Sequence, residues 1–308
     1  MNKKLLITGA NGLLGSNLVY HAADRYEVTA CSLTSVGSSK PVRCIQMDVT
    51  QEARVREVVT KVGPDVIIHC AAETRVDFCE DNRDHAAQVN TVGTAHIGQA
   101  AEDVGALVVY VSSDSVFDGA RGNYTESDLP NPLNVYSKTK AAGERALVDC
   151  CSRHLIARTN MFGWNMKPKQ SLSEWVLSRL RAGETISGFQ DVVFAPLIVN
   201  DIATLLLDMV EGGLSGLYHV CARDHLSKYE FARRIAEQYG LDTALVKPSS
   251  LDQASLMAPR PKLTFLDVTR VEADLGRNLP TVDDGLRRFR ELGQSGFAAD
   301  LKSGLDGD

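Results

Sequence analysis

A tyrosine and a lysine four residues apart are well suited to acid–base chemistry. Tyr136 and Lys140 lie in an amphipathic stretch, so a helix would place them on one face, one turn apart. A tyrosine hydroxyl has a reference pKa of about 10, and a nearby ammonium lowers that pKa by stabilising the phenolate. The pair could then exchange a proton with a substrate oxygen near neutral pH. The same spacing is common on solvated helix faces, so other residues must support this interpretation.

A pair of serines offers a hydroxyl that could act with Tyr136. Ser112-Ser113-Asp114 ends an apolar run over 106–112 that is typical of a β-strand. Open α/β sheets bind ligands at the carboxyl ends of their strands. A hydroxyl at this edge could polarise a substrate carbonyl. Together, these residue types predict a site that moves hydride to or from a carbonyl or alcohol carbon.

The start of the chain predicts the cofactor for such chemistry. Gly9, Gly12 and Gly15 directly follow a first apolar run over 4–8 and open a helix-like segment. Glycines permit a tight turn and let a pyrophosphate approach the backbone, and the free N–H groups at a helix start favour the anion. The order of strand, glycines and helix therefore predicts a nicotinamide dinucleotide site and not an ordinary turn.

The identity of the cofactor stays open between NADP and NAD. The second predicted strand ends at Ser32, where an acidic residue would bind the adenosine ribose and select NAD. The lack of such a residue favours NADP. No arginine stands there for the 2′-phosphate, however, and Lys40 or Arg43 could help only if a loop folded back.

Three further residues each have two interpretations. Asp48 could accept a hydrogen bond from the adenine amino group, or it could cap its own loop. Ala71 and Ala72 follow the third apolar run and are small enough for a cofactor to lie flat against them. They could equally be ordinary packing residues.

The elements that must position these residues alternate along the first half of the chain. Apolar runs predict strands over 4–8, 27–32, 66–71, 106–112 and 154–158, and amphipathic segments predict helices over 14–25, 51–62, 84–104 and 135–151. This alternation is typical of βαβ units that build a parallel sheet with helices on both faces. The sequence therefore predicts an α/β fold of the Rossmann type, with a doubly wound parallel sheet.

The second half predicts a smaller C-terminal α/β substrate-binding lobe. Helices are predicted over 171–182, 201–209 and 228–239, and a long loop rich in proline and serine over 248–262. We expect a dinucleotide-binding domain over 1–158 with 190–222 returning to it, a lobe over 159–189 and 223–293, and a flexible tail over 294–308.

The composition excludes several classes of protein. A formal net charge of -6 argues against a nucleic-acid binder, which would need clustered basic residues. The sequence has no apolar stretch long enough to span a membrane, and its seven cysteines form no CxxC pair, so we expect a cytoplasmic protein with reduced thiols. The sequence has no closely spaced pair of histidines, so we expect no metal site. We expect His69 and His219 to lie in the core.

These motifs together resemble a known family, the extended short-chain dehydrogenase/reductases, and within it the group typified by dTDP-4-dehydrorhamnose reductase. The resemblance covers the N-terminal half densely, through 7–15, 65–72, 111–119, 132–140 and Gly143-Glu144, and continues in 158–163, 194–203 and Arg260-Pro261. It implies a reductase that uses NADP(H) or NAD(H) on a carbonyl of a nucleotide-linked keto sugar. It also implies a homodimer.

The resemblance assigns roles to individual residues. Ser113 would be the hydroxyl partner, Tyr136 the acid and base, and Lys140 the residue that holds the ribose and tunes Tyr136. The expected cofactor-binding residues are Gly9, Asn11, Gly12, Leu13, Leu14, Gly15, Ser32, Asp48, Val49, Ala71, Ala72, Asn90, Tyr136 and Lys140. The expected substrate-binding residues are Thr74, Asp114, Asn160 and Arg260, of which Arg260 could bind a diphosphate or be an ordinary loop arginine.

Departures from the family pattern keep other functions open. The reductases usually carry Thr in place of Ser113, an aromatic residue near Asn160 and Thr in place of Leu197, so the sugar is not fixed by the resemblance. Asp114 is followed by Ser115, where dehydratases of the family have Glu, and this disfavours elimination. Two alternatives are a nucleotide-sugar epimerase that retains NAD and a non-catalytic NADP-binding subunit like the methionine adenosyltransferase regulatory β subunit.

Overall fold

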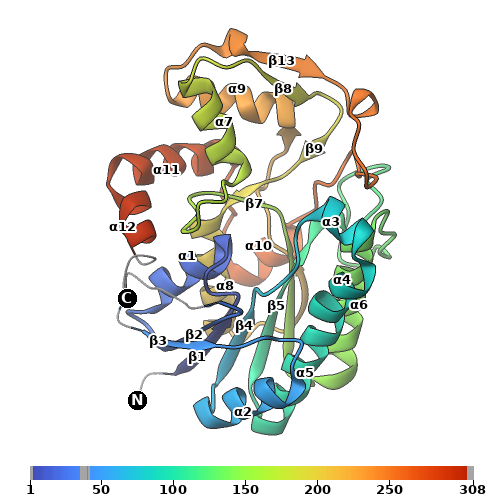
Figure 1. Ribbon diagram of the computed structural model, residues 1–308, viewed down its shortest axis with the longest axis vertical. Helices are drawn as coiled ribbons and strands as arrows, with labels where there is room; N and C mark the ends of the chain where they lie inside the picture. Colours follow the sequence, from blue (N-terminus) through green and yellow to red (C-terminus); the bar gives the residue numbers. More distant parts are fainter. Residues whose placement is uncertain (1–2, 35–39, 41, 304–308) are drawn as a thin grey trace.

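A sheet of seven parallel strands forms the centre of the molecule (Figure 1). The structure, a computed structural model, describes residues 3–34, 40 and 42–303. The strands lie in the order β11-β6-β5-β4-β1-β2-β3, and each neighbouring pair is parallel. Their bounds are β1 (Lys4–Thr8), β2 (Glu27–Ser32), β3 (Arg43–Gln46), β4 (Val66–His69), β5 (Leu107–Ser113), β6 (His154–Thr159) and β11 (Gly216–His219).

The strand order confirms the predicted doubly wound Rossmann-type fold. The chain runs outward from β1 to β3 and then returns to add β4 on the other side of β1. Such a reversal opens a crevice between the loops that follow the two central strands, and ligands of open α/β sheets bind there. A ligand site is therefore expected at the loops after β1 and β4.

Two of the seven strands were not predicted. β3 has four residues, and most of its side chains are exposed, so neither a long apolar run nor clean alternation marks it. β11 is the edge strand beside β6, although it comes from the second half of the chain. Strand propensity alone does not show which sheet a distant segment joins.

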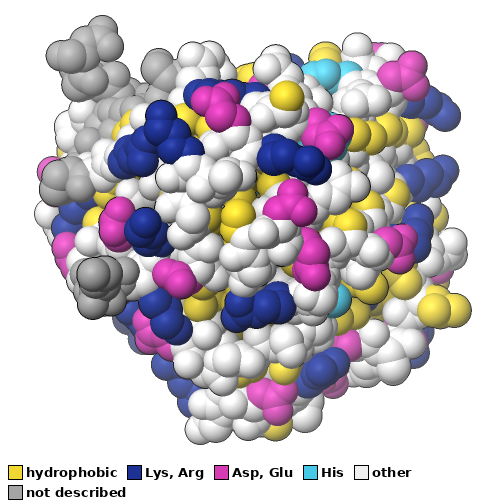
Figure 2. Space-filling model, turned by 90° about the horizontal axis from the view of Figure 1, so that it is seen from below, with side chains coloured by type: hydrophobic (Ala, Val, Ile, Leu, Met, Phe, Trp, Pro, Cys, Tyr) yellow, Lys and Arg dark blue, Asp and Glu magenta, His cyan; other side chains and the backbone are white. Residues whose placement is uncertain are grey.

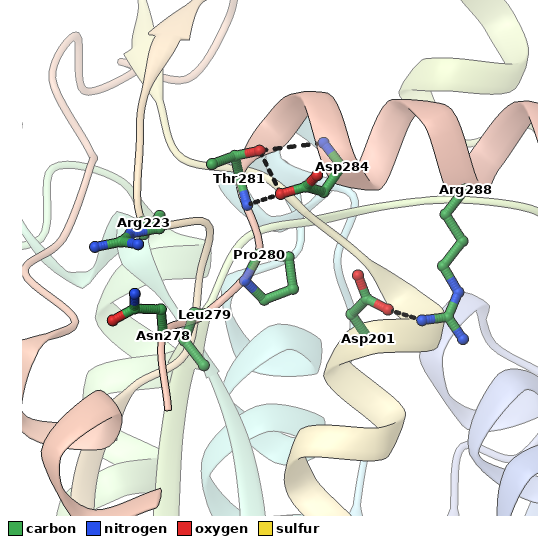
Figure 3. A pocket seen from close by; sticks show the side chains of 8 residues that line it. All are labelled: Asp201, Arg223, Asn278, Leu279, Pro280, Thr281, Asp284 and Arg288. Carbon is green, nitrogen blue, oxygen red and sulfur yellow. Dashed lines mark hydrogen bonds and ion pairs between the residues drawn. The ribbon is translucent and has the colours of Figure 1, made fainter. Parts of the chain in front are cut away.

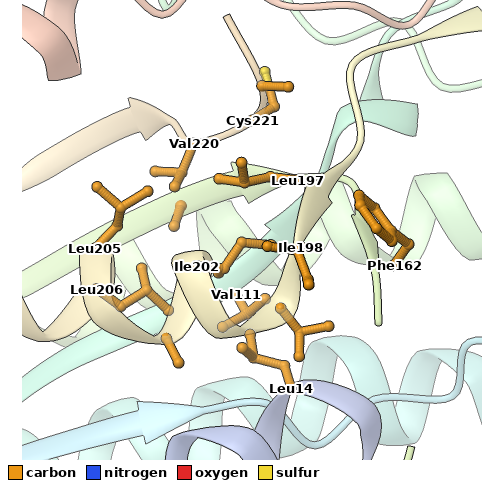
Figure 4. Close-up of a cluster of buried hydrophobic side chains, with 14 of the residues drawn as sticks. Leu14, Val111, Phe162, Leu197, Ile198, Ile202, Leu205, Leu206, Val220 and Cys221 are labelled. Atoms are coloured by element: carbon orange, nitrogen blue, oxygen red, sulfur yellow. The ribbon is translucent and has the colours of Figure 1, made fainter. Parts of the chain in front are cut away.

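Helices cover both faces because the strand side chains alternate between two cores. Leu5 and Ile7 belong to one core and Leu6 to the other. On the first face lie α1 (Leu13–Ala22) and α8 (Val199–Glu211), and on the second α2 (Glu52–Val62), α5 (Gly93–Val104) and α6 (Val135–Cys150). Figure 4 shows part of the first core, with Leu14, Val111 and Ile202 among its packed side chains.

The predicted single helix over 84–104 is divided in the structure. It consists of α4 (Arg83–Ala87), a π-helical turn η1 (Gln88–Val92) and then α5. The π turn has only five residues, too few for a change in helical period to be recognised from the apolar pattern. Such turns are frequent at functional sites. A further short helix, α3 (Val76–Asp81), precedes this region and was not predicted.

The smaller lobe lies at the top of Figure 1. The predicted helices over 171–182, 201–209 and 228–239 are confirmed as α7, α8 and α9. Ser171 with Glu174, and Ser227 with Glu230, form capping boxes at the starts of α7 and α9. The remaining elements are α7 (Leu172–Arg181), α9 (Lys228–Gln238), α10 (Thr269–Leu275), α11 (Val282–Gln294), β7 (Met161–Phe162), β8 (Ile186–Phe189), β9 (Val193–Phe194), β10 (Leu197–Ile198), β12 (Leu226–Ser227) and β13 (Val246–Ser249).

The predicted loop over 248–262 is only partly a loop. Its first residues complete β13, which pairs with β8. Residues 256–262, which we call the strap, then return to the larger domain. Asn134 at the start of α6 donates to the carbonyl of Pro259 at 2.9 Å, and Leu263 donates to Gly119 O at 3.0 Å. The strap thus connects the lobe to the end of β5 and the start of α6.

The predicted flexible tail contains a helix, α12 (Phe297–Ser303). Phe297 and Leu301 are buried, and the Phe297 ring packs edge-on against Tyr20 of α1 at 4.9 Å between centroids. The prediction of a tail from 294 onward is therefore wrong for these residues. Small and acidic residues suggested fraying, but two apolar side chains four residues apart are enough to dock one turn. Residues 304–308 lie outside the described residues.

Charges of both signs are mixed on the surface. On the face shown in Figure 2, Lys and Arg side chains are interspersed with Asp and Glu. Ion pairs such as Arg54–Glu57 at 2.8 Å and Arg179–Glu184 at 2.7 Å join exposed residues. Mixed charges of this kind do not produce a strong single-sign field. No helix in the described part of the chain is long and apolar enough to cross a membrane.

Candidate active site

The glycine loop follows β1 and begins α1 through close backbone contacts. Gly9 has a left-handed φ of +64°, and a Cβ added there would lie 2.7 Å from the backbone nitrogen of Ala71. A Cβ on Gly15 would lie 2.1 Å from the carbonyl oxygen of Gly9. Gly12 is the N-cap of α1 and has no side chain to occupy the N–H groups of its first turn. These groups can therefore bind an anion.

The side chains around this loop do different things. Asn11 is buried and donates to the Thr34 hydroxyl at 2.8 Å, which ties the loop to the end of β2. Ser32, the last residue of β2, is buried at the same edge. Leu14 is buried in the core, whereas Leu13 is partly exposed.

Neither basic residue considered for the 2′-phosphate lies at the end of β2. Arg43 is paired with Thr29 in the sheet, three residues before the end of that strand. Lys40 lies 3.6 Å from the Asp24 carboxylate and 4.8 Å from the centre of the Tyr20 ring. Most of the intervening segment, residues 35–39 and 41, lies outside the described residues. The cofactor preference therefore does not rest on Arg43 or Lys40.

The Asp48 carboxylate caps its own loop. Its Oδ1 accepts hydrogen bonds from the backbone N–H and the hydroxyl of Thr50, at 2.9 and 2.8 Å. Val49 is buried, and a Cβ on Gly93 would lie 2.8 Å from its Cγ2. The local loop-capping interpretation of Asp48 is thus present in the structure, and it uses Oδ1.

The loop after β4 is fixed by Asn90 from the π-helical turn. The buried Asn90 amide accepts from Glu73 N at 2.8 Å and donates to Glu73 O at 3.1 Å and to Thr139 Oγ1 at 3.0 Å. Ala71 and Ala72 are partly exposed in this loop, and Thr74 is exposed. Asn90 therefore supports the loop and α6 from inside the protein through bonds to Glu73 and Thr139.

Ser113, Tyr136 and Lys140 come together at the carboxyl end of β5 and the first turns of α6. Lys140 is buried and donates to Val111 O at 2.8 Å, with its Nζ 4.0 Å from the centre of the Tyr110 ring. Burial lowers the pKa of Lys140 to about 7, although the Glu144 carboxylate opposes the shift. Tyr136 is half-buried.

The pKa of Tyr136 differs from the expectation. Burial raises it to about 12, and a side-chain hydrogen bond with Ser113 opposes the rise only in part. We expected the ammonium of Lys140 to lower this pKa. Its Nζ is instead engaged by the Val111 carbonyl, and burial favours the neutral phenol. In the protein alone, Tyr136 is therefore a proton donor and not a phenolate.

Hydroxyl groups link Ser113 to a buried carboxylate. Ser113 Oγ donates to Asp114 Oδ1 at 3.1 Å and lies 2.9 Å from Ser115 Oγ. Ser137 in turn donates to Ser115 Oγ at 3.0 Å. Burial raises the pKa of Asp114, while hydrogen bonds from Asn160, Thr264 and Ser113 oppose the shift.

The surroundings of Asp114 contain residues that sequence reasoning missed. Asn160 donates to Asp114 Oδ2 at 2.7 Å, so these two predicted residues do meet. Burial lowers the pKa of Lys228, and the negative charge of Asp114 opposes part of this shift. This cation therefore lies near that carboxylate. Its Nζ lies 5.8 Å from the centre of the Phe194 ring. A lysine in the first turn of a helix opposes the helix dipole, and this was the one available signal.

Arg260 fastens the strap. Its Nη2 lies 2.9 Å from Asp77 Oδ1 in α3, and its Nη1 donates to Ala258 O at 2.9 Å. The same Asp77 oxygen accepts from Ala258 N at 3.0 Å. Arg260 is thus bonded within the protein, between the strap and α3. Its positive charge lowers the pKa of Lys228, so the two cations are near one another.

A separate surface hollow of about 460 Å³ lies away from these residues (Figure 3). Its charged residues are already paired: Arg288 with Asp201, and Asp284 with Thr281 at the start of α11. It is lined by Asp201, Arg223, Asn278, Leu279, Pro280, Thr281, Asp284 and Arg288, none of which is a predicted site residue. The described residues contain no group of His, Cys, Asp or Glu side chains that could hold a metal ion.

Comparison with known proteins identifies the family. A family model described as the RmlD substrate binding domain matches residues 3–293. The chain belongs to this family. The resemblance to the dTDP-4-dehydrorhamnose reductase group, inferred above from the motifs, is thereby confirmed.

Relatives in the RmlD family carry several descriptions. The chain is 33% identical to the probable low-salt glycan biosynthesis reductase Agl14 of Haloferax volcanii, over 91% of this chain and 95% of that protein. It is 30% identical to methionine adenosyltransferase 2 subunit beta of Bos taurus, over 91% and 85% of the two chains. A crystal structure of dTDP-4-dehydrorhamnose reductase from Bacillus anthracis in complex with NADP has a TM-score of 0.86 and 30% identity, covering 94% of this chain and 99% of that one.

Proposed function

We propose that this protein is a NAD(P)-dependent reductase that delivers hydride to a carbonyl of a nucleotide-linked keto sugar. The observation that carries this proposal is the meeting of Ser113, Tyr136 and Lys140 at the carboxyl ends of the strands, beside the crevice that the glycine loop borders. The oxidoreductase descriptions of Agl14 and of the Bacillus anthracis enzyme support it.

The residues around the crevice fit a nicotinamide dinucleotide. At Gly9 and Gly15 a side chain would collide with backbone, so the loop is kept thin where a pyrophosphate must approach. The α1 N-terminus, capped only by Gly12, offers N–H groups to that anion. We infer that Asp48, Ala71 and Ala72 border the adenosine half and that Lys140 binds the nicotinamide ribose. NADP is the favoured cofactor because β2 ends at Ser32 and not at a carboxylate.

In this mechanism the protein supplies the proton and the orientation of the carbonyl. The dinucleotide provides the hydride. Tyr136, whose pKa of about 12 keeps it protonated, gives its proton to the substrate oxygen as the carbonyl carbon is reduced to an alcohol carbon. Ser113 donates a hydrogen bond to the same oxygen once its hydroxyl turns from Asp114.

The substrate side supports a polar, nucleotide-linked sugar. Asp114 and Asn160 offer an acceptor and a donor next to Ser113, and Lys228 adds a cation. Thr74 is exposed in the loop after β4. We infer that Arg260, with Asp77, holds the strap over the bound substrate and presents positive charge toward a diphosphate.

The direct test is consumption of NADPH by the purified protein with a panel of dTDP-linked and UDP-linked 4-keto sugars, followed at the nicotinamide absorbance band. We expect oxidation of NADPH with at least one keto sugar and recovery of the reduced sugar. Inertness across the whole panel would reject this substrate class. Product formation with retained NAD and without net absorbance change would indicate an epimerase instead.

A second candidate function is favoured by one observation, the 30% identity to methionine adenosyltransferase 2 subunit beta over most of both chains. In that case the protein would bind NADP as part of an assembly and perform no reduction itself. The two functions separate on Tyr136→Phe. The variant should abolish reductase turnover, whereas a binding subunit would keep its activity in the assembly and lose it only when the glycine loop is changed.

A further inference from the structure

A fully buried histidine at the end of β4 lies between the glycine loop and the Ser/Tyr/Lys site. Its Nδ1 is 2.7 Å from the Thr8 hydroxyl, and its Nε2 is 3.2 Å from the Thr94 hydroxyl. The His69 side chain has no exposed surface. The sequence predicted only a core histidine here, yet both ring nitrogens are used in specific hydrogen bonds.

The neighbouring bonds fix the direction of every donor. Thr94 Oγ1 donates its single proton to the carbonyl of Asn90 at 2.8 Å, so it must accept a proton from His69 Nε2. His69 Nδ1 is then an acceptor and takes the proton of the Thr8 hydroxyl, which itself accepts from Ala71 N at 3.2 Å. The bonds run without conflict through Ala71, Thr8, His69, Thr94 and Asn90. We call this series the His69 chain.

The His69 chain requires a neutral imidazole. Burial, together with the charge of Lys140, lowers the pKa of His69 to about 3. A second proton on the ring would turn Nδ1 into a donor facing the hydroxyl proton of Thr8 and would break the series. The ring also stacks on Tyr110, with centroids 5.6 Å apart and planes inclined by 25°.

Each end of the His69 chain contacts part of the site. Thr8 directly precedes Gly9, and Ala71 is the residue against which Gly9 packs. At the other end, the Asn90 carbonyl also accepts from the Tyr110 hydroxyl at 3.4 Å. Tyr110 supports the Lys140 ammonium from below, at 4.0 Å.

Gly143 closes the contact with α6. A Cβ at this position would lie 2.5 Å from both the Asn90 carbonyl oxygen and the Tyr110 hydroxyl. The helix that carries Tyr136 and Lys140 therefore rests directly on the end of the His69 chain. A shift of that carbonyl would move the helix and its two reactive residues.

We propose that His69 is a positioning residue which, through Thr8 and Thr94, sets the glycine loop and the Asn90 carbonyl in one fixed relation and thereby places Lys140 for the reaction. This inference rests on the proposed reductase function. A purely structural histidine would contribute stability alone. A positioning residue must also change the rate constant and its pH dependence when the bonds are lost.

A matched pair of variants at Thr94 tests this proposal. Thr94→Val keeps the shape of this fully buried side chain but removes the hydroxyl that bonds His69, the Asn90 carbonyl and Tyr110, while Thr94→Ser keeps it. We expect Thr94→Val to lower kcat at least tenfold with the keto-sugar KM within twofold, and to shift the pH profile of kcat. Thr94→Ser should restore kcat to within threefold of the parent. Equal kcat and equal pH profiles for the two variants would overturn the proposal.

His69→Phe and a control histidine extend the test. His219 is also fully buried at the end of a parallel strand, and it lies outside the His69 chain. We expect His69→Phe to lower kcat and weaken NADP binding, measured by fluorescence, at temperatures where both variants stay folded. His219→Phe should lower the unfolding temperature while kcat stays within twofold. Losses of kcat that follow stability equally in both variants would contradict the proposal.

Nitrogen-15 chemical shifts of the histidine rings give a readout that does not need turnover. We expect His69 to show the Nε2–H neutral tautomer at pH 7, and a protonated ring or the Nδ1–H tautomer would overturn the assignment. If NADP binds and this tautomer is found but no keto sugar is reduced, the reductase function fails while the His69 chain stands. If sugars are reduced and the Thr94 variants do not differ, only the positioning role fails.

Discussion

The two regions that we propose as the cofactor side and the substrate side of this site use different kinds of contact. The cofactor side is built from backbone that is packed against backbone, as at Gly9, Gly15 and Ala71, within one compact stretch of sheet and loop. The substrate side is built from charged and polar side chains of Asp114, Asn160, Lys228 and Arg260. These residues come from four separate segments and are joined by hydrogen bonds and by the strap.

This difference predicts how each side responds to change. Backbone contacts cannot be weakened gradually, since a single methyl group must displace main chain. Side-chain contacts can be lost one at a time, and partly exposed ion pairs contribute little each. We therefore expect abrupt losses on the cofactor side and near the reacting atoms, and graded losses in KM on the substrate side.

The largest effect is expected at Tyr136, where the two sides meet. Tyr136→Phe removes the proton that the reduced oxygen must receive, so kcat should fall by about 10²- to 10⁴-fold. NADP binding should change less than twofold because the ring remains. Stopped-flow absorbance of NADPH measures the rate, and equilibrium fluorescence measures the binding. A variant that retained full kcat would exclude Tyr136 as the proton donor.

The next largest effect is expected at Gly15. A Cβ there would lie 2.1 Å from the Gly9 carbonyl oxygen, so Gly15→Ala must distort the loop. A cost of about 3 kcal/mol in NADP binding corresponds to roughly a hundredfold rise in Kd. Gly63→Ala is the control, since an added Cβ at Gly63 has no atom within 4 Å, although the φ of Gly63 is left-handed at +57°. Equal Kd values for the two variants would contradict the backbone-contact model.

Acid should destabilise the protein through histidines that fold in the neutral form. The folded pKa is lowered to about 3 for His69 and to about 4 for His21 and His219. The unfolded chain takes up protons first, below about pH 6.5, so stability falls as the pH drops from there toward about 4. Each histidine contributes a slope of up to about 1.4 kcal/mol per pH unit.

Urea unfolding at a series of pH values measures this slope. His219→Gln removes one of the three groups and should flatten the decline by about one third. Saturating NADP should also move the midpoint of acid unfolding to lower pH, because NADP binds only the folded state. An unchanged slope in the variant would show that His219 does not contribute.

A moderate effect is expected when the strap is released. Asp77→Asn removes the charge that pairs with Arg260 at 2.9 Å. The pair is partly exposed, so we expect a loss of about 1 kcal/mol, which is about a fivefold rise in the KM for the keto sugar. NADP binding should not change. Glu184→Gln, which removes the charge that pairs with Arg179 at 2.7 Å outside the strap, is the matched control.

The smallest effect is expected at Lys228. Lys228→Met removes the cation near Asp114 and should raise the keto-sugar KM about threefold without changing NADP binding. Steady-state kinetics with Lys247→Met, an exposed lysine in β13, as the control would check it. A change in NADP affinity and none in KM would place Lys228 on the cofactor side and reverse the comparison.

The same contrast explains what the sequence could predict. Strong periodicity marked the five central strands and most of the larger helices, and the glycines and the Tyr136 and Lys140 pair lie within short motifs. β3, η1 and the strap were missed because their positions depend on tertiary contacts and not on local pattern. Lys228 and Thr264 come near Asp114 only through folding, so their spacing in the chain carried no signal. The predicted direction of the Tyr136 pKa shift was wrong because burial cannot be inferred from an i, i+4 spacing.

Helix α8 has a consequence for how the protein is made. It packs against α1, although the two helices are almost two hundred residues apart in the sequence. Asn200 is bonded to Asn17 at 3.0 Å, and Asp208 to Arg25, just after α1, at 3.4 Å. A fragment that ended at residue 158 would leave β6 without its β11 neighbour and the apolar side of α1 in water. During synthesis, a nascent chain that already contains every motif of the glycine loop therefore keeps this apolar surface exposed until α8 has left the ribosome.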